Sequence, residues 1–394
     1  MAGWRIPLTD LDYDQRERAA TLGPLDDRWL SMGPEVQAFE REFAELVGVD
    51  HAIAVASGTA ALHLAFLALG LSAGDEVVQP AMNFVAAANM TLAVGAAPVF
   101  ADIVALDDPT VSPRHVEALI GARTRAIVVM HYGGAACRME EITAIARERG
   151  VAVVEDACHA VGATYGSVAG PDADRVVGSL GDLACFSFFS NKNLATGEGG
   201  MVVTADGQLA ERVRLLRSHG MTTLTWDRFQ GQARGYDVVG HGFNYRIDDL
   251  RAALGRVQLA KLPAGNASRR ARVEQYRALL AGRSSLGLVH TDRAATSAHH
   301  LMVLIAPDAD TREVVATALH DVGVQTSMHY PCITDFTAFA DLVGSDVPVS
   351  RAFAARAFTV PLHPNLDPAA IEEIAGILVD AAPVSAGVAS SERR

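Results

Sequence analysis

From about residue 34 onward, short and nearly continuous apolar runs alternate with segments of helix length. The first pair is typical, because 51–57 reads HAIAVAS and 58–70 reads GTAALHLAFLALG, a helix that is apolar on most of its faces. Apolar strands separated by helices indicate a mostly parallel sheet that is covered on both faces. We therefore predict an α/β protein. The further strand candidates lie in DEVVQP, APVFAD, TRAIVVMH, VAVVEDA, ACFSFF and GGMVVT.

The pattern changes around NYRIDDLRAALGRVQLAKL, which reads as one long helix followed by an arginine-rich helical segment. A strand candidate, HHLMVLIAP, and two further helices near 310–323 and 367–381 come after it. We predict a large domain with an N-terminal arm over residues 1–255 and a smaller α+β domain over residues 256–382. The ending, 383–394, is small and polar and is predicted to be disordered.

Composition excludes several classes of protein. A net charge of -13 argues against broad binding to nucleic acid or anionic membranes. The first residues lack the pattern of a signal peptide, and no run reaches the ~18 apolar residues of a membrane span. The four cysteines have no CxxC spacing, so neither a zinc site nor a disulfide framework is indicated. The adjacent histidines His299 and His300 would point to opposite faces of a strand and so could not easily bind one metal ion together. We expect a cytoplasmic protein with no metal, no nucleic-acid partner and no membrane partner.

Polar side chains follow several of the predicted strands. Asp156 ends VAVVED, and Lys192 follows ACFSFF in the turn SNKNLATGEGG. Because the carboxyl ends of parallel strands meet at one edge of a sheet, function is expected there. A buried aspartate or lysine is costly without a partner. One interpretation is an Asp156–Lys192 ion pair that braces the sheet.

The turn ASGTAA supports a second interpretation. The free backbone N–H groups at Gly58, Thr59 and Ala60 would point from a helix N-terminus toward a phosphate, although SGT also serves as an ordinary N-cap. A phosphate cradle, a lysine amine and a carboxylate for a ring nitrogen are the groups that pyridoxal phosphate (PLP) requires. Lys192 would then form a Schiff base with PLP. Phe84 could cover one face of the ring or belong to the core.

These motifs occur in ordered blocks over most of the chain, and together the blocks resemble the DegT/StrS family of PLP-dependent sugar aminotransferases. The blocks begin with WLSMGPEVQAFEREFAELVG and end with VPLHPNL. Between them lie ASGTAALHLAFLALG, VVEDACHAVGATYG, SFFSNKNLATGEGG, GFNYRIDDLRAALG and MHYPCITDFTAF. Agreement of several blocks in order is far more specific than any one motif.

The resemblance implies the PLP-dependent transferase fold type I, with a seven-stranded, mostly parallel sheet between helices and a smaller C-terminal α+β domain. It implies that Lys192 is the Schiff-base lysine and the proton shuttle. Asp156 would pair with the pyridine nitrogen, and His159 would lie near the ring and its 3-hydroxyl. In many family members proline precedes the lysine together with threonine, serine or glycine, whereas this chain has Ser190 and Asn191.

The resemblance also implies the remaining contacts. Asn244 would reach the cofactor phosphate from the other subunit, which makes a homodimer part of the active site. His329 would lie near the substrate entrance. The other cofactor-binding residues implied by the family are Gly58, Thr59 and Ser187 at the phosphate and Phe84 stacked on the ring.

The function implied is ping-pong transfer of an amino group from an amino acid, by family habit glutamate, to a ketone. The GEGG run and His159 are more similar to members that act on 4-keto nucleotide sugars than to the 3-keto group. Alternatives are an aminocyclitol or other specialised-metabolite ketone, a dehydratase or lyase that uses PLP, and a PLP-binding regulator. Lys192 argues against the dehydratases, which replace this lysine with histidine, and the lack of a basic helix-turn-helix stretch argues against a DNA regulator.

Overall fold

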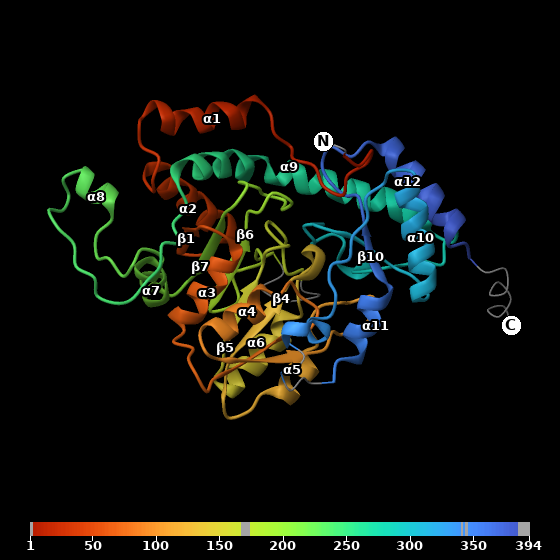
Figure 1. The fold of residues 1–394 in the computed structure, drawn as a ribbon, viewed down its shortest axis with the longest axis horizontal. Coiled ribbons are helices and arrows are strands. Elements are labelled where there is room, and N and C mark those ends of the chain that lie inside the picture. The colour runs from red at the N-terminus through yellow and green to blue at the C-terminus, as the bar shows by residue number, and fades with distance from the viewer. Residues whose placement is uncertain (1–2, 167–173, 340–341, 343–345, 385–394) are drawn as a thin grey trace.

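The computed structural model describes residues 3–166, 174–339, 342 and 346–384, and its larger part is built on a seven-stranded sheet (Figure 1). The strand order is β1-β7-β6-β5-β4-β2-β3, and the pairings are parallel except those of β7 with β1 and β6. This confirms the predicted α/β class and the mostly parallel seven-stranded sheet. The strands are β1 His51–Val55, β2 Glu76–Pro80, β3 Ala97–Ala101, β4 Thr124–Met130, β5 Ala152–Asp156, β6 Leu183–Ser187 and β7 Gly200–Thr204.

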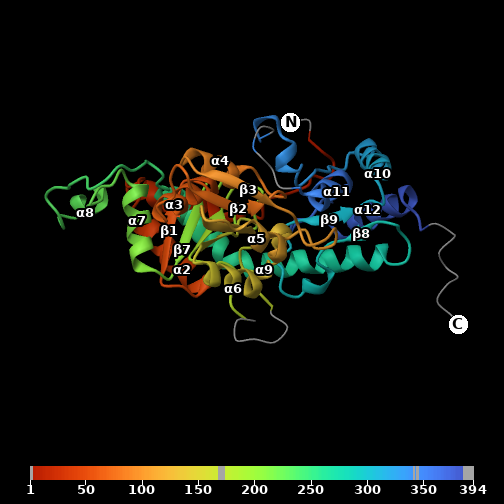
Figure 2. The ribbon, with the colours of Figure 1, turned by 90° about the horizontal axis from the view of Figure 1, so that it is seen from below.

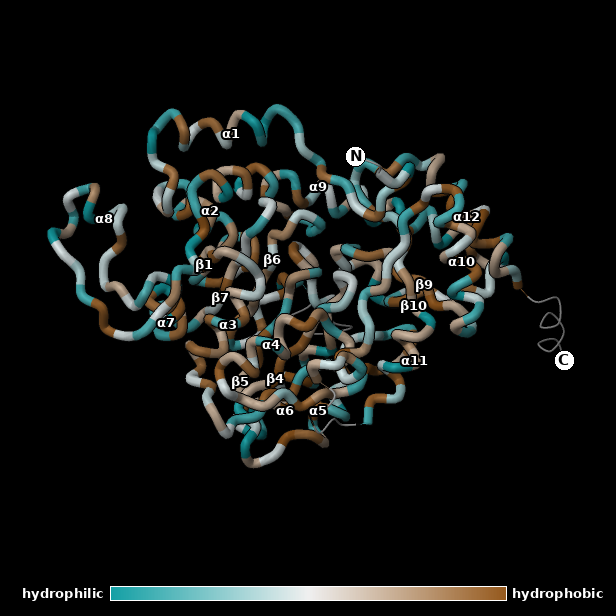
Figure 3. The backbone as a smooth tube through the Cα atoms, in the orientation of Figure 1, coloured by the Kyte–Doolittle hydropathy of each residue, from teal (hydrophilic) through white to brown (hydrophobic). Residues whose placement is uncertain are grey.

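Helices cover both faces of this sheet, and each strand contributes side chains to both. In β4, Ile127 and Val129 pack with the cluster that includes helix α2, whereas Ala126 and Val128 pack with helix α3 on the other face. Figure 2 shows the two helical layers edge-on, and Figure 3 shows hydrophobic residues concentrated around the central strands. The helices of this part are α1 Gln15–Asp26, α2 Pro34–Val47, α3 Gly58–Ala68, α4 Ala86–Ala93, α5 Pro113–Leu119, α6 Met139–Arg149, α7 Gly207–Arg217 and α8 Thr225–Phe229.

The helix ends follow local sequence signals. Helix α2 begins at Pro34, whose missing N–H costs nothing in the first turn, and it ends at Gly48, which has a φ of 74°. Helix α3 is capped by the Ser57 hydroxyl, which accepts a hydrogen bond from the Ala60 N–H at 3.1 Å. This cap places the N-terminus of α3 at the carboxyl end of β1.

The C-terminal part has its own small sheet and core. Its antiparallel strands lie in the order β10-β9-β8, and α10 and α12 supply most of the helical side chains of the core. The predicted strand and the two predicted helices of this region are present. The elements are α9 Asp249–Leu280, β8 Gly287–Leu288, β9 Met302–Ile305, α10 Ala309–Asp321, α11 Pro348–Arg356, β10 Ala357–Val360 and α12 Pro368–Ala381, with short 3-10 turns at Tyr132–Gly134, Thr291–Arg293, Ile333–Asp335 and Thr337–Phe339.

Helix α9 joins the two parts. It runs without interruption for 32 residues across the predicted boundary at 255/256, and it contains Pro263. It contacts α1 and α2 near its start and α12 near its end, so both parts share it (Figure 1). The division into 1–255 and 256–382 stays a prediction. The predicted disordered tail, 383–394, lies outside the described residues apart from Pro383 and Val384.

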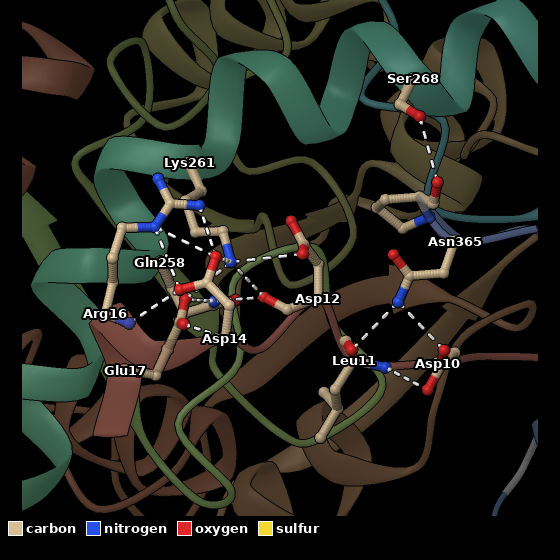
Figure 4. Close-up of polar contacts among 11 residues, drawn as sticks. Asp10, Leu11, Asp12, Asp14, Arg16, Glu17, Gln258, Lys261, Ser268 and Asn365 are labelled. Carbon is tan, nitrogen blue, oxygen red and sulfur yellow. Dashed lines mark hydrogen bonds and ion pairs between the residues drawn. The ribbon is translucent and has the colours of Figure 1, made fainter. Parts of the chain in front are cut away.

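The N-terminal arm is fastened along α9 by polar contacts (Figure 4). Lys261 lies 2.9 Å from the Glu17 carboxylate and 3.3 Å from that of Asp12, and Gln258 donates to Glu17 at 2.7 Å. Farther along, the Asn365 amide donates to Asp10. The arm therefore touches both parts of the molecule. Within the described residues, no helix is long and apolar enough to cross a membrane.

Candidate active site

A cavity of about 270 Å³ lies at the carboxyl ends of the central strands. Its walls come from the turns after β1, β2, β5 and β6 and from the segment that carries His329 and Tyr330. Every residue predicted for the site lines this cavity except Asn244. The predicted residues in its wall are Gly58, Thr59, Phe84, Asp156, His159, Ser187, Lys192 and His329.

Asp156 and Lys192 both line this cavity, Asp156 from the end of β5 and Lys192 from the turn between β6 and β7. Asp156 is the last residue of β5, is 4% exposed, and accepts hydrogen bonds from Asn83 Nδ2 at 3.4 Å and the Cys158 N–H at 3.2 Å. No ion pair joins Asp156 to Lys192, both of which lie within the described residues, so the bracing interpretation finds no support. Burial lowers the pKa of Lys192, and the nearby Cys158 and Asp156 only partly oppose this.

The turn before α3 forms a narrow cradle. A Cβ atom at Gly58 would lie 2.8 Å from the Cβ of Ser187 and 3.1 Å from the sulfur of Cys158. Glycine is therefore required because two chain segments approach closely here. The same approach brings the Ser187 side chain to the exposed N-terminus of α3, where an anion is favoured.

Three aromatic or imidazole side chains close the cavity on the side of the C-terminal part. His159 lies 3.0 Å from the Tyr330 hydroxyl, measured from its Nε2. His329 Nδ1 lies 3.0 Å from the Thr359 hydroxyl, and burial, with a smaller effect of Lys192, lowers the pKa of His329 to about 4. Burial and Lys192 also hold the pKa of His159 well below its usual value. Both histidines are neutral at physiological pH.

Phe84 lies at the mouth of the cavity, and the residue is 53% exposed. Its centroid is 5.8 Å from that of Tyr330, and its N–H donates to the Asn83 side chain at 2.6 Å. Phe84 is therefore not a core residue, which removes the alternative considered from the sequence.

Comparison with known proteins agrees with this geometry. Residues 12–379 match the model of the DegT/DnrJ/EryC1/StrS aminotransferase family. The chain belongs to this family. It is 38% identical over 362 residues to the spore coat polysaccharide biosynthesis protein SpsC of Bacillus subtilis, covering 89% of this chain and 90% of SpsC.

Solved structures show the same family resemblance. Helicobacter pylori PseC, an aminotransferase involved in the biosynthesis of pseudoaminic acid, is 26% identical with a TM-score of 0.87, over 95% of this chain and 98% of PseC. Spr1654 from Streptococcus pneumoniae in its PLP form is 25% identical with a TM-score of 0.87, over 95% and 98% of the two chains. As a DegT/DnrJ family member, the protein is a PLP-dependent aminotransferase.

The residues present fit this cofactor. The cradle at Gly58 is too narrow for a Cβ atom and keeps the backbone at the start of α3 uncovered by a side chain at that position. The Lys192 amine has no hydrogen-bond or ion-pair partner among the described residues. His159 Nδ1 is buried without a partner. This chain has only two lysines, and the other, Lys261, is held by carboxylates of the N-terminal arm. Lys192 is thus the one lysine in the cavity of this DegT/DnrJ family chain.

Asn244 lies outside the cavity of its own chain and is exposed, between β7 and α9, so its contact with the phosphate in the other subunit's site stays a prediction. Sequence reasoning did not assign Asn83, which holds Asp156, or Tyr330, which contacts His159. The signal for both was adjacency, since each is next to a residue that was assigned. Asn191 and Cys158 also line the cavity and are likewise next to assigned residues, whereas Glu198 lines it without that signal.

Proposed function

We propose that the protein transfers an amino group from an amino acid to the ketone of a sugar. The observation that carries the proposal is the meeting of an unpaired lysine amine, a buried carboxylate and an anion cradle in one cavity. The names of SpsC and PseC, which refer to polysaccharide and pseudoaminic acid biosynthesis, support a sugar substrate.

In this proposal the chain's own residues divide the work. PLP supplies a conjugated ring that withdraws electrons from the reacting carbon. Lys192 Nζ holds the cofactor and then moves a proton to and from the substrate carbon, a role that its lowered pKa favours because more of the amine is uncharged. Asp156 would pair with the ring nitrogen and keep it protonated, and His159 would lie beside the ring.

The remaining predicted residues bind and orient. Gly58, Thr59 and Ser187 would hold the phosphate, which the N-terminus of α3 favours electrostatically. Phe84 would cover one face of the ring from the mouth of the cavity. His329 would contact the incoming substrate as a neutral imidazole.

We propose a ping-pong order, in which the amino group stays in the site while the first product leaves and the ketone enters. The cavity contains one lysine, and donor and acceptor would both have to react beside it. They would therefore occupy the cavity one after the other and not together. The donor is proposed to be glutamate and the acceptor a 4-keto nucleotide sugar, on the basis of the GEGG run and His159.

We also propose a homodimer with shared sites and a cytoplasmic location. Asn244 is exposed, and the neighbouring segment carries exposed apolar side chains, among them Phe229, Tyr236 and Val238. Several exposed apolar side chains on one segment would be buried if a second copy of the chain packed against them. The four cysteines are free, which fits a reducing compartment.

The decisive test is chemical. Borohydride reduction of the PLP-loaded protein, followed by peptide mass spectrometry, is expected to label Lys192, with Lys261→Arg as a control that leaves the label in place. Labelling of Lys261 or of no lysine would refute the assignment.

A second test addresses substrate. Glutamate is expected to bleach the visible absorbance of the bound cofactor, and the glutamate-treated enzyme is then offered keto sugars and keto-cyclitols. Amination of a 4-keto nucleotide sugar supports the proposal. Amination of cyclitols alone, or loss of water from the substrate in place of amination, would replace it with an alternative activity.

A further inference from the structure

Asn193, the residue after Lys192, is fixed by three hydrogen bonds behind the active site. Its Nδ2 donates to Asn266 Oδ1 at 2.9 Å and to the Ala298 carbonyl at 2.8 Å. Asn266 in turn donates its Nδ2 to the Val161 carbonyl at 3.0 Å. Because backbone carbonyls can only accept, the orientation of both side-chain amides is determined.

This orientation determines the tautomer of His300. The remaining atom of Asn193, Oδ1, lies 3.1 Å from His300 Nδ1, and an amide oxygen can only accept. His300 Nδ1 must therefore carry a hydrogen. The ring is 2% exposed, and its backbone N–H donates to the Gly133 carbonyl at 2.9 Å. A buried, neutral His300 then has a bare lone pair on Nε2.

The ring packed against His300 carries a second unpaired atom. His300 Nε2 and His159 Nδ1 are both buried without hydrogen-bond partners, and the two ring centroids are 4.3 Å apart. If His159 carried its hydrogen on Nε2, two lone pairs would face a buried space with no donor. If the hydrogen is on Nδ1, His159 can donate to the lone pair of His300, which would satisfy both atoms.

We propose that His300 is a positioning residue that fixes the tautomer of His159 and thereby the direction of a hydrogen-bond chain that ends in the active site. His159 donates from Nδ1 to His300, so its Nε2 accepts from the Tyr330 hydroxyl at 3.0 Å. Every donor in the chain points away from the cavity, toward the Val161 carbonyl. The Tyr330 oxygen consequently faces the cavity as an acceptor. The proposal rests on the proposed role of His159 in the site.

His299 and His300 precede β9 and are not part of it. The expectation that they point to opposite faces of a strand is therefore wrong. His299 Nε2 instead lies 2.7 Å from the Ala294 carbonyl, so the two neighbours have separate partners. Only His300 joins the chain that leads to His159.

The direct test is nitrogen NMR on holoenzyme labelled with 15N-histidine, with signals assigned by His159→Gln and His300→Gln. Both rings are expected to be neutral with the hydrogen on Nδ1. A His159 that is cationic or carries its hydrogen on Nε2 would overturn the proposal. This measurement does not depend on turnover, so it separates failure of the chain from failure of the proposed function, which the borohydride label reports.

Kinetics supply the second test. His300→Leu removes donor and acceptor, and we expect kcat to fall about tenfold, the value of one hydrogen bond, while KM for glutamate changes little. His300→Gln keeps an amide donor and acceptor and is expected to restore most of kcat. His320→Leu, on the exposed surface of α10, is the control. Equal activity of the Leu and Gln variants, or loss in KM alone, would refute a positioning role.

Discussion

At the scale of single residues, the site depends on Lys192, whose amine has a lowered pKa and therefore loses its proton more easily than an ordinary lysine. Lys192 lies among buried groups, and no carboxylate is close enough to pair with it among the described residues. A buried amine without an ion pair costs stability when it is protonated. Stability is therefore given up at the position where the reactive amine is needed.

This cost predicts a pH effect in the cofactor-free protein. The folded-state pKa of Lys192 lies below its unfolded value of 10.5, so the unfolded state binds more protons between the two values and stability rises with pH there. Lys192→Met should flatten that rise and be more stable than wild type at neutral pH. Urea unfolding across the pH range measures it. Lys261→Met, which breaks contacts to Glu17, should be less stable.

The cradle gives a second prediction at this scale. Gly58→Ala places a methyl group 2.8 Å from the Ser187 side chain, so we expect PLP affinity to fall roughly tenfold or more and stability to fall by about 1–3 kcal/mol. Titration followed by fluorescence measures the affinity. Gly376→Ala in α12, where the added methyl meets nothing within 4 Å, is the matched control. Unchanged PLP affinity in Gly58→Ala would show that the cradle is not used.

At the scale of elements, α2 depends on a distant helix for its cap. The residue before it, Gly33, has no side chain, and Asp249 in the first turn of α9 accepts from the Gly33 N–H at 2.8 Å and the Val36 N–H at 3.1 Å. Asp248, its neighbour, caps α9 itself through the Arg251 N–H. Two consecutive aspartates thus serve two different helices.

We expect Asp249→Ala to lower the free energy of unfolding by about 1–2 kcal/mol, because the N-terminal donors of α2 lose their acceptor. Chemical denaturation measures the change. Asp380→Ala, exposed near the end of α12, should leave stability almost unchanged. Equal stability of the two variants would contradict the assigned role of Asp249.

A feature could be predicted from the sequence when it depends on residues that are close together along the chain. The end of β5 at Asp156, the turn that carries Lys192 after β6, and the stop of α2 at Gly48 follow from local pattern. The cap from Asp249 and the contact of Asn193 with His300 join residues far apart in the chain, and a single sequence carries no distance between them. The same reason hid Asn83 and Tyr330 beside their assigned neighbours.

At the scale of the whole molecule, the exposed position of Asn244 separates it from its own cavity. The proposed contact of Asn244 with PLP would therefore come from a second copy of the chain. In that arrangement each site would take Lys192 from one chain and Asn244 from the other.

Mixing two inactive variants tests this arrangement. Lys192→Ala and Asn244→Ala should each have low activity alone. After unfolding and refolding together, half of the dimers are mixed and each has one intact site, so about a quarter of wild-type activity should return. Size-exclusion chromatography with light scattering checks the dimers. No recovery in mixed dimers would place Asn244 outside the partner's site.

The proline within α9 has a mechanical consequence. Pro263 has no N–H to donate, so the ladder of hydrogen bonds in α9 lacks one rung between the segment against α2 and the segment against α12. Bending stiffness is lowest at such a gap. If the C-terminal part moves toward or away from the cavity, the hinge would lie at Pro263, and the two halves of α9 on either side of it would move as rigid bodies.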